Sequence, residues 1–450
     1  MGVRLLTIMG SGETAPTMVK VHRAVAERLA ADGGGPVRGL MLDTPFGFQT
    51  NAPEIASRAV DYFRDSVGAE LEIAGLRSGD DLAGAGGDAI IAKLAAAPFV
   101  FAGPGSPTYA LRQWRDTLVP GMLAEKLALG GAVTFASAAA LTLGVLSVPV
   151  YEIYKVGEAP RWVDGLDLLA GLGLPAVVIP HYDNAEGGTH DTRFCYLGED
   201  RLAGMERALP EGTFVLGVDE HTALSLDLDA GTATVAGHGG VTVRAEGRSE
   251  VVGPGEPIAI EALVDIARRL AARGPAGGDG HGAVGDAGGG TRAGAVLGSG
   301  AGQATAASAS AAAAPAGSPL LQAIRGHEAA FRAARDGADA AGMVEALLAL
   351  EAELWAWRAD TLQSDEMDRG RTALRAMVSE LGEVALQGTR DPAEVVGPYV
   401  ELALGLRESA RAERRFAEAD GVRDRLVALG VEVHDTPEGS TWTLGNGSPA

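Results

Sequence analysis

The sequence predicts an α/β protein with a mostly parallel sheet, helices on both of its faces, and a separate α-helical domain behind it. Three observations support this prediction. In residues 1–245, short β-rich runs alternate with helical windows, the pattern of a parallel sheet. The stretch 273–318 is almost wholly Gly, Ala and Ser, which predicts a flexible linker. From residue 319 to 450 the periodicity is helical almost throughout.

The individual elements follow from these patterns. The predicted strands are Val3–Gly10, Gly39–Pro45, Leu71–Leu76, Pro98–Gly105, Ala132–Phe135, Pro175–His181 and Thr213–Glu220, with an antiparallel pair in 223–244. The helices between them are Thr17–Asp32, Pro53–Ser66 and Asp88–Ala96, and the extension 246–272 carries one more, Glu256–Ala272. The C-terminal domain has helical segments at Leu320–Arg335, Ala340–Ala359, Asp365–Gln387, Pro392–Leu406 and Glu408–Leu429, then a short β-like tail.

Composition excludes several classes of function. A formal net charge of -22 argues against a nucleic-acid coat or a binder of anionic membranes, since both need basic surface. The single cysteine, Cys195, excludes a disulfide framework and a multi-cysteine zinc site. No uninterrupted apolar run reaches about 18 residues, and the start of the chain has no signal-peptide pattern. We therefore expect a soluble, cytoplasmic protein that does not bind membranes.

Ser137 is the first candidate for chemistry. It lies where a buried strand breaks into the Ala-rich segment that ends at Gly144, which would expose its hydroxyl at the carboxyl end of the strand. This is the geometry of a nucleophile elbow. The alternative is an ordinary strand–helix junction capped by a small polar residue.

A serine nucleophile needs a base, an acid and an oxyanion pocket. His181 directly follows a buried strand, as does His221, so both are candidate bases. Two carboxylates, Glu152 and Glu158, lie between Ser137 and His181 in the chain. For the oxyanion, the donors we expect are the amide of Ala138 and those of a Gly-rich strand-end loop, Gly103 to Gly105. Each of these features also has an alternative explanation without catalysis. The histidines can be structural, the glutamates can be solvated loop carboxylates, and the Gly-rich loop can be a tight turn.

Two other chemistries are weaker. The segment HYDNAEGGTHDTRFC contains metal-ligand types, but their spacing matches no zinc motif. Those residues are His181, Asp183, His190, Asp191 and Cys195. The N-terminal GSGET lacks both phosphate-binding glycine patterns, so nucleotide binding is not indicated. We expect neither a metal nor a cofactor.

Over about residues 3–244 the chain resembles the cyanophycinase and aspartyl-dipeptidase family of serine peptidases, which have a flavodoxin-like, class I glutamine amidotransferase-like fold. The resemblance rests on IMGSGET, FAGPGSP, FASAAALTLG, VIPHYDN and GVDEHTAL, in that order. It implies Ser137 as nucleophile and His181 as base, with Glu158 a better match by spacing for the acid than Glu152. It also implies that Arg193 lies in a substrate loop. The family usually has glycine two residues before its serine. Here Phe135 stands there, and its bulk predicts a more open or shifted elbow.

The segment Arg407–Trp442 resembles the C-terminal end of cysteinyl-tRNA synthetases. The matching positions are Ala419, Asp420, Arg423, Asp424, Leu426, Gly430, Asp435, Thr436, Gly439 and Trp442. The chain has none of a synthetase's catalytic motifs, so the resemblance implies a retained module and not a ligase. The helical domain is acidic in sum, with 14 Arg, no Lys and 23 Asp plus Glu. It has a local basic set made of Arg407, Arg411, Arg414, Arg415, Arg423 and Arg425.

Three functional hypotheses follow. The first is a cofactor-independent serine hydrolase of a small peptide or related amide. The second is a tRNA-associated protein that docks through its C-terminal domain. The third is a non-catalytic scaffold that binds a small amide or amino acid in the same pocket. In each case the helical domain could also act as an interaction module, for example in a homodimer.

Overall fold

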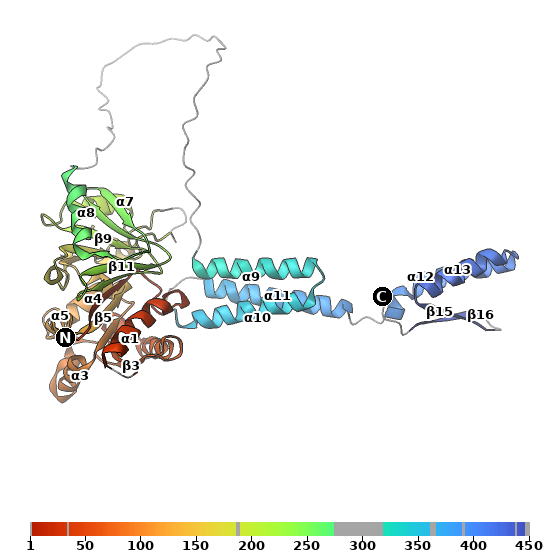
Figure 1. Cartoon of the computed structure of the whole chain (residues 1–450), viewed down its shortest axis with the longest axis horizontal. Helices are drawn as coiled ribbons and strands as arrows, with labels where there is room; N and C mark the ends of the chain where they lie inside the picture. The colour runs from red at the N-terminus through yellow and green to blue at the C-terminus, as the bar shows by residue number, and fades with distance from the viewer. Residues whose placement is uncertain are drawn as a thin grey trace, which may run out of the picture. The chain divides into compact units, whose positions relative to one another are not determined.

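The computed structural model describes residues 2–33, 36–185, 190–273, 318–360, 366–388, 392–436 and 439–445. The expected linker, 273–318, falls almost entirely outside the described residues. The chain divides into two compact units. The first comprises Met1–Ser318 together with Glu353–Asp365, and the second comprises Pro319–Ala352 together with Glu366–Ala450. The predicted fold class is confirmed, since the first unit is an α/β structure with a mostly parallel sheet and the second is mainly helical (Figure 1).

The larger sheet of the first unit has eight strands in the order β14-β11-β10-β1-β5-β4-β2-β3. The five strands from β1 to β3 in this order run parallel to one another, and the other three add antiparallel at one edge. Their bounds are β1 Arg4–Met9, β2 Arg38–Met41, β3 Glu70–Ile73, β4 Phe99–Ala102, β5 Gly131–Ala136, β10 Thr222–Asp227, β11 Thr232–Gly237 and β14 Ile258–Ala259.

A second sheet has the order β13-β12-β9-β8, of which β8 and β9 are parallel. Its strands are β8 Ala176–Ile179, β9 Phe214–Val218, β12 Val241–Ala245 and β13 Arg248–Val252. The extension predicted to hold one helix therefore also supplies the strands β13 and β14. A two-stranded pair, β6 Leu146–Ser147 with β7 Val163–Asp164, completes the strands described in this unit.

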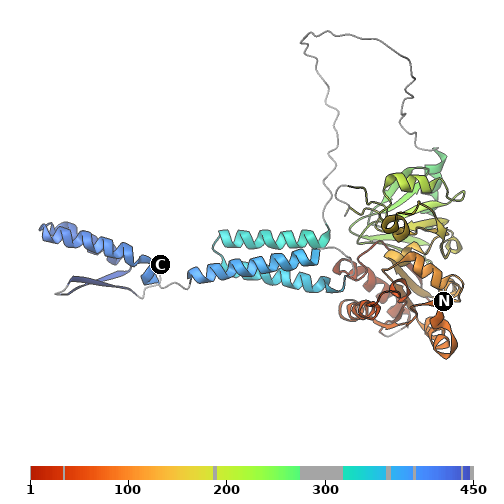
Figure 2. The same ribbon diagram turned by 180° about the vertical axis from the view of Figure 1, so that it is seen from behind.

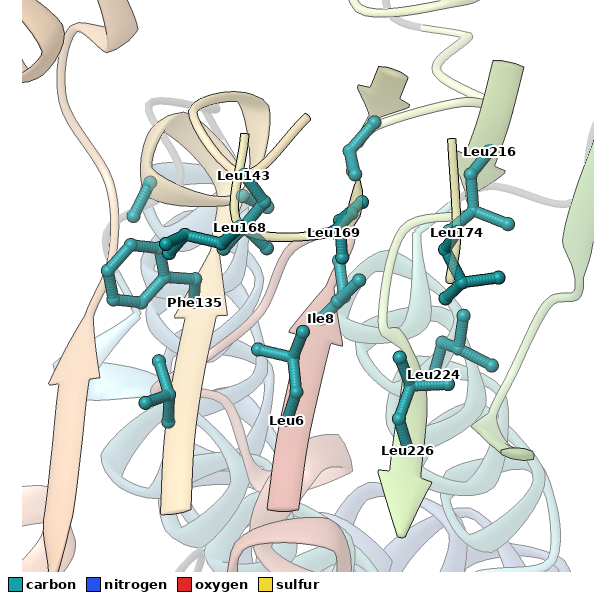
Figure 3. Close-up of a cluster of buried hydrophobic side chains, with 14 of the residues drawn as sticks. Leu6, Ile8, Phe135, Leu143, Leu168, Leu169, Leu174, Leu216, Leu224 and Leu226 are labelled. Carbon is teal, nitrogen blue, oxygen red and sulfur yellow. The ribbon is translucent and has the colours of Figure 1, made fainter. Parts of the chain in front are cut away.

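Helices pack on both faces of the large sheet because its strands alternate their side chains between two cores. Leu6 and Ile8 of β1 face one core with α3, α4 and α5, whereas Leu5 faces the other with α1 and α2. Figure 3 shows the first core spread over neighbouring strands. Each fully buried leucine or phenylalanine there contributes about 1.5–3 kcal/mol. The helices are α1 Val19–Gly33, α2 Ala52–Tyr62, α3 Gly84–Ala96, α4 Pro107–Trp114, α5 Val119–Leu129, α6 Ser137–Leu141, α7 Glu199–Glu206 and α8 Ile260–Ala272.

The second unit contains three long helices that lie side by side in both views (Figures 1 and 2). They are α9 Pro319–Asp336, α10 Ala340–Ala356 and α11 Glu366–Gly388, of which α10 belongs to the second unit only as far as Ala352. A smaller assembly follows, made of α12 Pro392–Ala412, α13 Phe416–Ala428 and the hairpin β15 Val431–Thr436 with β16 Gly439–Leu444. The break predicted near residue 407 lies instead at Arg414, whose φ is 61°. In the described part of the chain, no helix is long and apolar enough to cross a membrane.

Candidate active site

Ser137 lies at the turn from β5 into α6 with a left-handed backbone, φ 49°. A non-glycine residue is strained in this region, and such strain is typical of functional turns. Phe135 lies at the end of β5, two residues before Ser137. Its side chain is fully buried in the core, with its ring centroid 5.8 Å from that of Trp114. The bulk of this ring is therefore accommodated in the hydrophobic core.

Three side chains form a continuous hydrogen-bonded series at this turn. Ser137 Oγ lies 2.9 Å from His181 Nε2, and His181 Nδ1 lies 2.8 Å from Glu220 Oε1. A carboxylate only accepts hydrogen bonds, so the His181 Nδ1–H donates to Glu220 and leaves Nε2 to accept from the serine hydroxyl. This arrangement has the order and spacing that a nucleophile, a base and an orienting acid require.

Strand pairing explains why these residues meet. β8 and β9 are parallel, and Ile179 pairs with Gly217, so the chain reaches His181 and Glu220 at the same edge of the second sheet. In the larger sheet, β1, β4 and β5 are also parallel neighbours and end together. Their carboxyl ends carry the turn after Met9, the Gly-rich loop and Ser137, the usual position for a ligand site in an α/β protein.

Glu220 is held in place by the loop that follows His181. Asn184 Nδ2 donates to Glu220 Oε1 over 3.2 Å. The backbone N–H of Glu220 donates to Asp183 Oδ1 over 2.7 Å. Burial acts to raise the pKa of Glu220, but the hydrogen bond and charge of His181 and the hydrogen bond from Asn184 outweigh it. The net pKa lies below the ordinary value, so Glu220 is ionised at neutral pH.

A half-buried carboxyl precedes Glu220 in the chain. It belongs to Asp219, whose Oδ2 accepts the N–H of Gly240 over 2.7 Å. Burial, followed by the nearby Asp183 carboxyl, raises the pKa of Asp219 to about 6. The pKa of Asp183 is also raised, mainly by burial. Below about pH 6 Asp219 is therefore protonated, and the charge beside Glu220 changes.

The Gly-rich loop after β4 lies beside the serine turn. Gly105 has φ 137°, and a Cβ on it would lie 2.1 Å from the carbonyl oxygen of Pro45, so only glycine fits. The N–H of Ala139 donates to the carbonyl of Gly103 over 3.2 Å, which ties the loop to α6. Gly105 and Ala138 both line the cavity that contains Ser137.

That cavity has a volume of about 320 Å³, within the range of small-molecule sites. Ser137 and His181 line it together with Glu13, a carboxyl that is 2% exposed. The remaining lining side chains are mostly apolar or aromatic, among them Phe46, Ile55, Leu141, Val150, Tyr151, Tyr154 and Tyr196. The space can hold a compound of about dipeptide size.

The structure places the two acids expected from sequence elsewhere. Glu158 forms an ion pair with Arg161 on the surface, and Glu152 accepts a hydrogen bond from Thr108 Oγ1 over 3.0 Å. Glu220, which the sequence analysis missed, lies next to His181. The sequence contains a signal that could have identified Glu220. VIPH and GVDE each end a buried strand, and if these two strands are parallel neighbours, His181 and Glu220 lie at the same edge of the sheet. Glu220 lies outside the interval between Ser137 and His181 in which the acid was expected.

Arg193 pairs with Asp191 through two contacts, Nε to Oδ1 at 2.9 Å and Nη2 to Oδ2 at 2.8 Å. It does not line the cavity. His221, the other candidate base, is buried, and its Nδ1 is hydrogen-bonded to Thr17 Oγ1 at 2.9 Å. Burial lowers the pKa of His221 to about 4. Within the described residues, no group of three or more His, Cys, Asp or Glu residues is arranged to hold a metal ion.

Comparison with known proteins gives different relatives for the two parts of the chain, and no family model matches it. Over its C-terminal region the chain is 36% identical, across 124 residues, to the cysteine–tRNA ligase of Arthrobacter sp. (strain FB24). It is 33% identical across 117 residues to the corresponding ligase of Deinococcus radiodurans. These matches cover 26% and 24% of this chain, and the chain spans only 25% and 24% of those ligases.

Among solved structures, the chain is similar to a peptidase from an acI-B1 Actinobacterium, with 20% identity and a TM-score of 0.47. That match covers 57% of this chain and 97% of the other. A putative peptidase E protein from Listeria monocytogenes EGD-e matches with 14% identity and a TM-score of 0.36, over 53% of this chain and all of the other.

Proposed function

We propose that the α/β unit is a serine hydrolase that cleaves a peptide or related amide bond. The observation that carries this proposal is the hydrogen-bonded series from Ser137 through His181 to Glu220 at the wall of the cavity. Neither a cofactor nor a metal is needed for this chemistry, because the nucleophile and the proton carrier are both side chains.

The proposed reaction has two halves. Ser137 Oγ attacks the amide carbonyl while His181 Nε2 takes its proton, and Glu220 stabilises the imidazolium that forms. The backbone amides of Ala138 and Gly105 stabilise the negative charge on the carbonyl oxygen. His181 then gives its proton to the departing amine, and the serine ester remains. A water molecule, activated by His181, hydrolyses the ester and restores Ser137.

Covalent labelling with a fluorophosphonate tests this proposal directly. We expect the wild-type chain to react at Ser137 and Ser137→Ala to lose the label. Ser225→Ala is a matched control, since Ser225 lies on β10 outside the cavity, with its Oγ 3.4 Å from Thr7 Oγ1. Full labelling of Ser137→Ala, or no labelling of the wild type, would show that Ser137 is not an activated nucleophile.

We infer a second candidate function, tRNA binding by the C-terminal region, from its likeness to part of cysteine–tRNA ligases. The ion pairs of this region restrict such binding. Arg407 and Arg411 both bind Asp435, and Arg415 binds Glu413. Among the described residues, the remaining members of the basic set form no ion pair, and these are Arg414, Arg423 and Arg425. These three arginines are therefore the members of the basic set that can bind tRNA phosphates without breaking an ion pair.

A gel-shift titration with tRNA at low and moderate salt tests this second function. We expect a shift that weakens as salt rises and that is lost in a variant with alanine at 414, 423 and 425, because phosphate contacts release counterions. The single variants Arg414→Ala, Arg423→Ala and Arg425→Ala are compared with Arg268→Ala on α8, which removes one positive charge elsewhere. The absence of a salt-sensitive shift at micromolar protein would remove the hypothesis.

A further inference from the structure

The cavity beside Ser137 has an aromatic wall that the proposed reaction does not use. Tyr154 and Tyr196 both line it, and their rings stack with centroids 4.7 Å apart and planes 30° apart. His190 lies beyond Tyr154 at 6.3 Å with its ring nearly parallel, and Lys155 Nζ lies 5.0 Å from the Tyr154 centroid. Because stacked rings cover each other's facing sides, the pair offers a ligand in the cavity its edges and its uncovered faces.

The backbone holds Tyr196 close to the proposed base. Phe194, Cys195 and Tyr196 have consecutive φ values of 61°, 55° and 66°. Three successive non-glycine residues persist in this conformation only when their surroundings hold them there. Here the N–H of Cys195 donates to the carbonyl of His181 over 3.1 Å, and the N–H of Phe194 donates to the carbonyl of Tyr182 over 2.9 Å. The Tyr196 loop is thus bonded to the segment that carries His181.

The charges around the cavity do not favour an acidic substrate side chain. Arg193, which was expected to lie in a substrate loop, is paired with Asp191 and does not line the cavity. A buried carboxyl, Glu13, does line it. Among the described residues that line the cavity, Lys155 is the one Lys or Arg, and its side chain is exposed and lies over the Tyr154 ring.

We propose that the stacked pair Tyr154–Tyr196 is a specificity site that selects a substrate with an aromatic side chain next to the amide to be cleaved. The inference rests on the proposed hydrolase function and names its substrate class. An aromatic side chain of the substrate packs against the tyrosine pair, while its carbonyl lies at Ser137. The rings supply apolar area and favourable stacking, which together favour an aromatic over a methyl side chain by about tenfold.

Binding to an inactive protein measures this preference without catalysis. We would titrate the full-length Ser137→Ala protein with phenylalanyl-alanine, alanyl-alanine and aspartyl-alanine by calorimetry. We expect phenylalanyl-alanine to bind about tenfold more tightly than alanyl-alanine, and aspartyl-alanine to bind no better than alanyl-alanine. Adding Tyr154→Ala should remove the advantage, whereas Tyr154→Phe should keep it because the ring remains.

Two controls separate the wall from general effects. Tyr109→Ala removes a tyrosine that does not line the cavity and whose ring lies 5.1 Å from that of Phe48 at a tilt of 54°, and it should leave the preference unchanged. Arg193→Ala should leave the ratio of phenylalanyl to aspartyl binding unchanged. Preferred binding of the aspartyl peptide, or an aromatic preference that survives Tyr154→Ala, would overturn the proposal.

If fluorophosphonate labels Ser137 but this preference is missing, only the specificity proposal fails. If Ser137 does not react, the hydrolase proposal fails while the binding result still stands.

Discussion

At the scale of single residues, the contrast between Glu220 and Glu158 is the sharpest test of the site. Glu220 contacts His181 at 2.8 Å, whereas Glu158 contacts Arg161 on the surface. We expect Glu220→Gln to lower kcat/KM for amide hydrolysis by about 100- to 10,000-fold, because an amide can hold the imidazole in the wrong tautomer and carries no charge. Glu158→Gln should change it by less than about threefold. Equal losses in the two variants would contradict the assignment of Glu220.

A buried histidine near the site predicts how stability depends on pH. His22 lies among Tyr62, Phe63 and Phe101, and its Nε2–H donates to the carbonyl of Glu13 over 2.8 Å. Burial lowers the pKa of His22 from 6.5 to about 4. The unfolded chain therefore binds this proton more readily, so the stabilising contribution is present above pH 6.5 and is lost as the pH falls towards 4.

This shift corresponds to a loss of about 2 kcal/mol of folding free energy between pH 7.5 and pH 5. Asp219, whose pKa is raised to about 6, acts in the opposite direction, so the comparison must be made between variants. His22→Gln keeps a donor for the Glu13 carbonyl but cannot be protonated. Thermal unfolding at both pH values should show that His22→Gln loses less folding free energy between pH 7.5 and pH 5 than the wild type does. An identical loss would show that His22 does not titrate as described.

At the scale of elements, the loop after β4 must pass very close to the segment after β2. Gly105→Ala would place a methyl group 2.1 Å from the Pro45 carbonyl oxygen and would also strain φ 137°. We expect a loss of about 2–4 kcal/mol in stability and of most labelling at Ser137, because the proposed oxyanion donors move. Gly171→Ala is the control, since nothing lies within 4 Å of the added carbon. Normal labelling and melting of Gly105→Ala would disprove this close packing.

At the scale of the whole molecule, the α/β unit is not continuous in sequence, because it includes Glu353–Asp365. Trp357 in this segment is 2% exposed, and its ring lies 5.4 Å from that of His221, next to Glu220. The carbonyl of Ala359 accepts from Thr14 Oγ1 over 2.6 Å, next to Glu13. The segment therefore packs against two turns that carry residues of the candidate site.

We expect Trp357→Ala to destabilise the α/β unit by about 3–5 kcal/mol, since it removes a buried indole. A chain that ends at residue 318 should be destabilised similarly and should show faster hydrogen exchange in 10–14 and 219–222. Trp355→Ala is the matched control, because Trp355 is 61% exposed and should cost less than about 1 kcal/mol. If the 1–318 chain melted at the same temperature as the α/β unit of the full-length chain, this stabilising role would be ruled out.

Much of the fold could be predicted from sequence because it depends on local patterns. Alternating strands and helices predicted a mostly parallel sheet with helices on both faces, and strand ends predicted where Ser137, His181 and the Gly-rich loop would lie. The helical C-terminal region followed in the same way from its periodicity. The end of α12 was misplaced, since the chain there has neither glycine nor proline to mark the break at Arg414.

What the tertiary structure alone decided was which distant residues come into contact. Glu220 meets His181 because β8 and β9 are neighbours in register, a relation that spacing along the chain does not contain. Trp357 likewise returns to the α/β unit and meets His221 across more than a hundred residues. The sequence by itself determined the strand ends and the types of side chain on them. The choice of partner depended on sheet order and packing, which are properties of the whole folded chain.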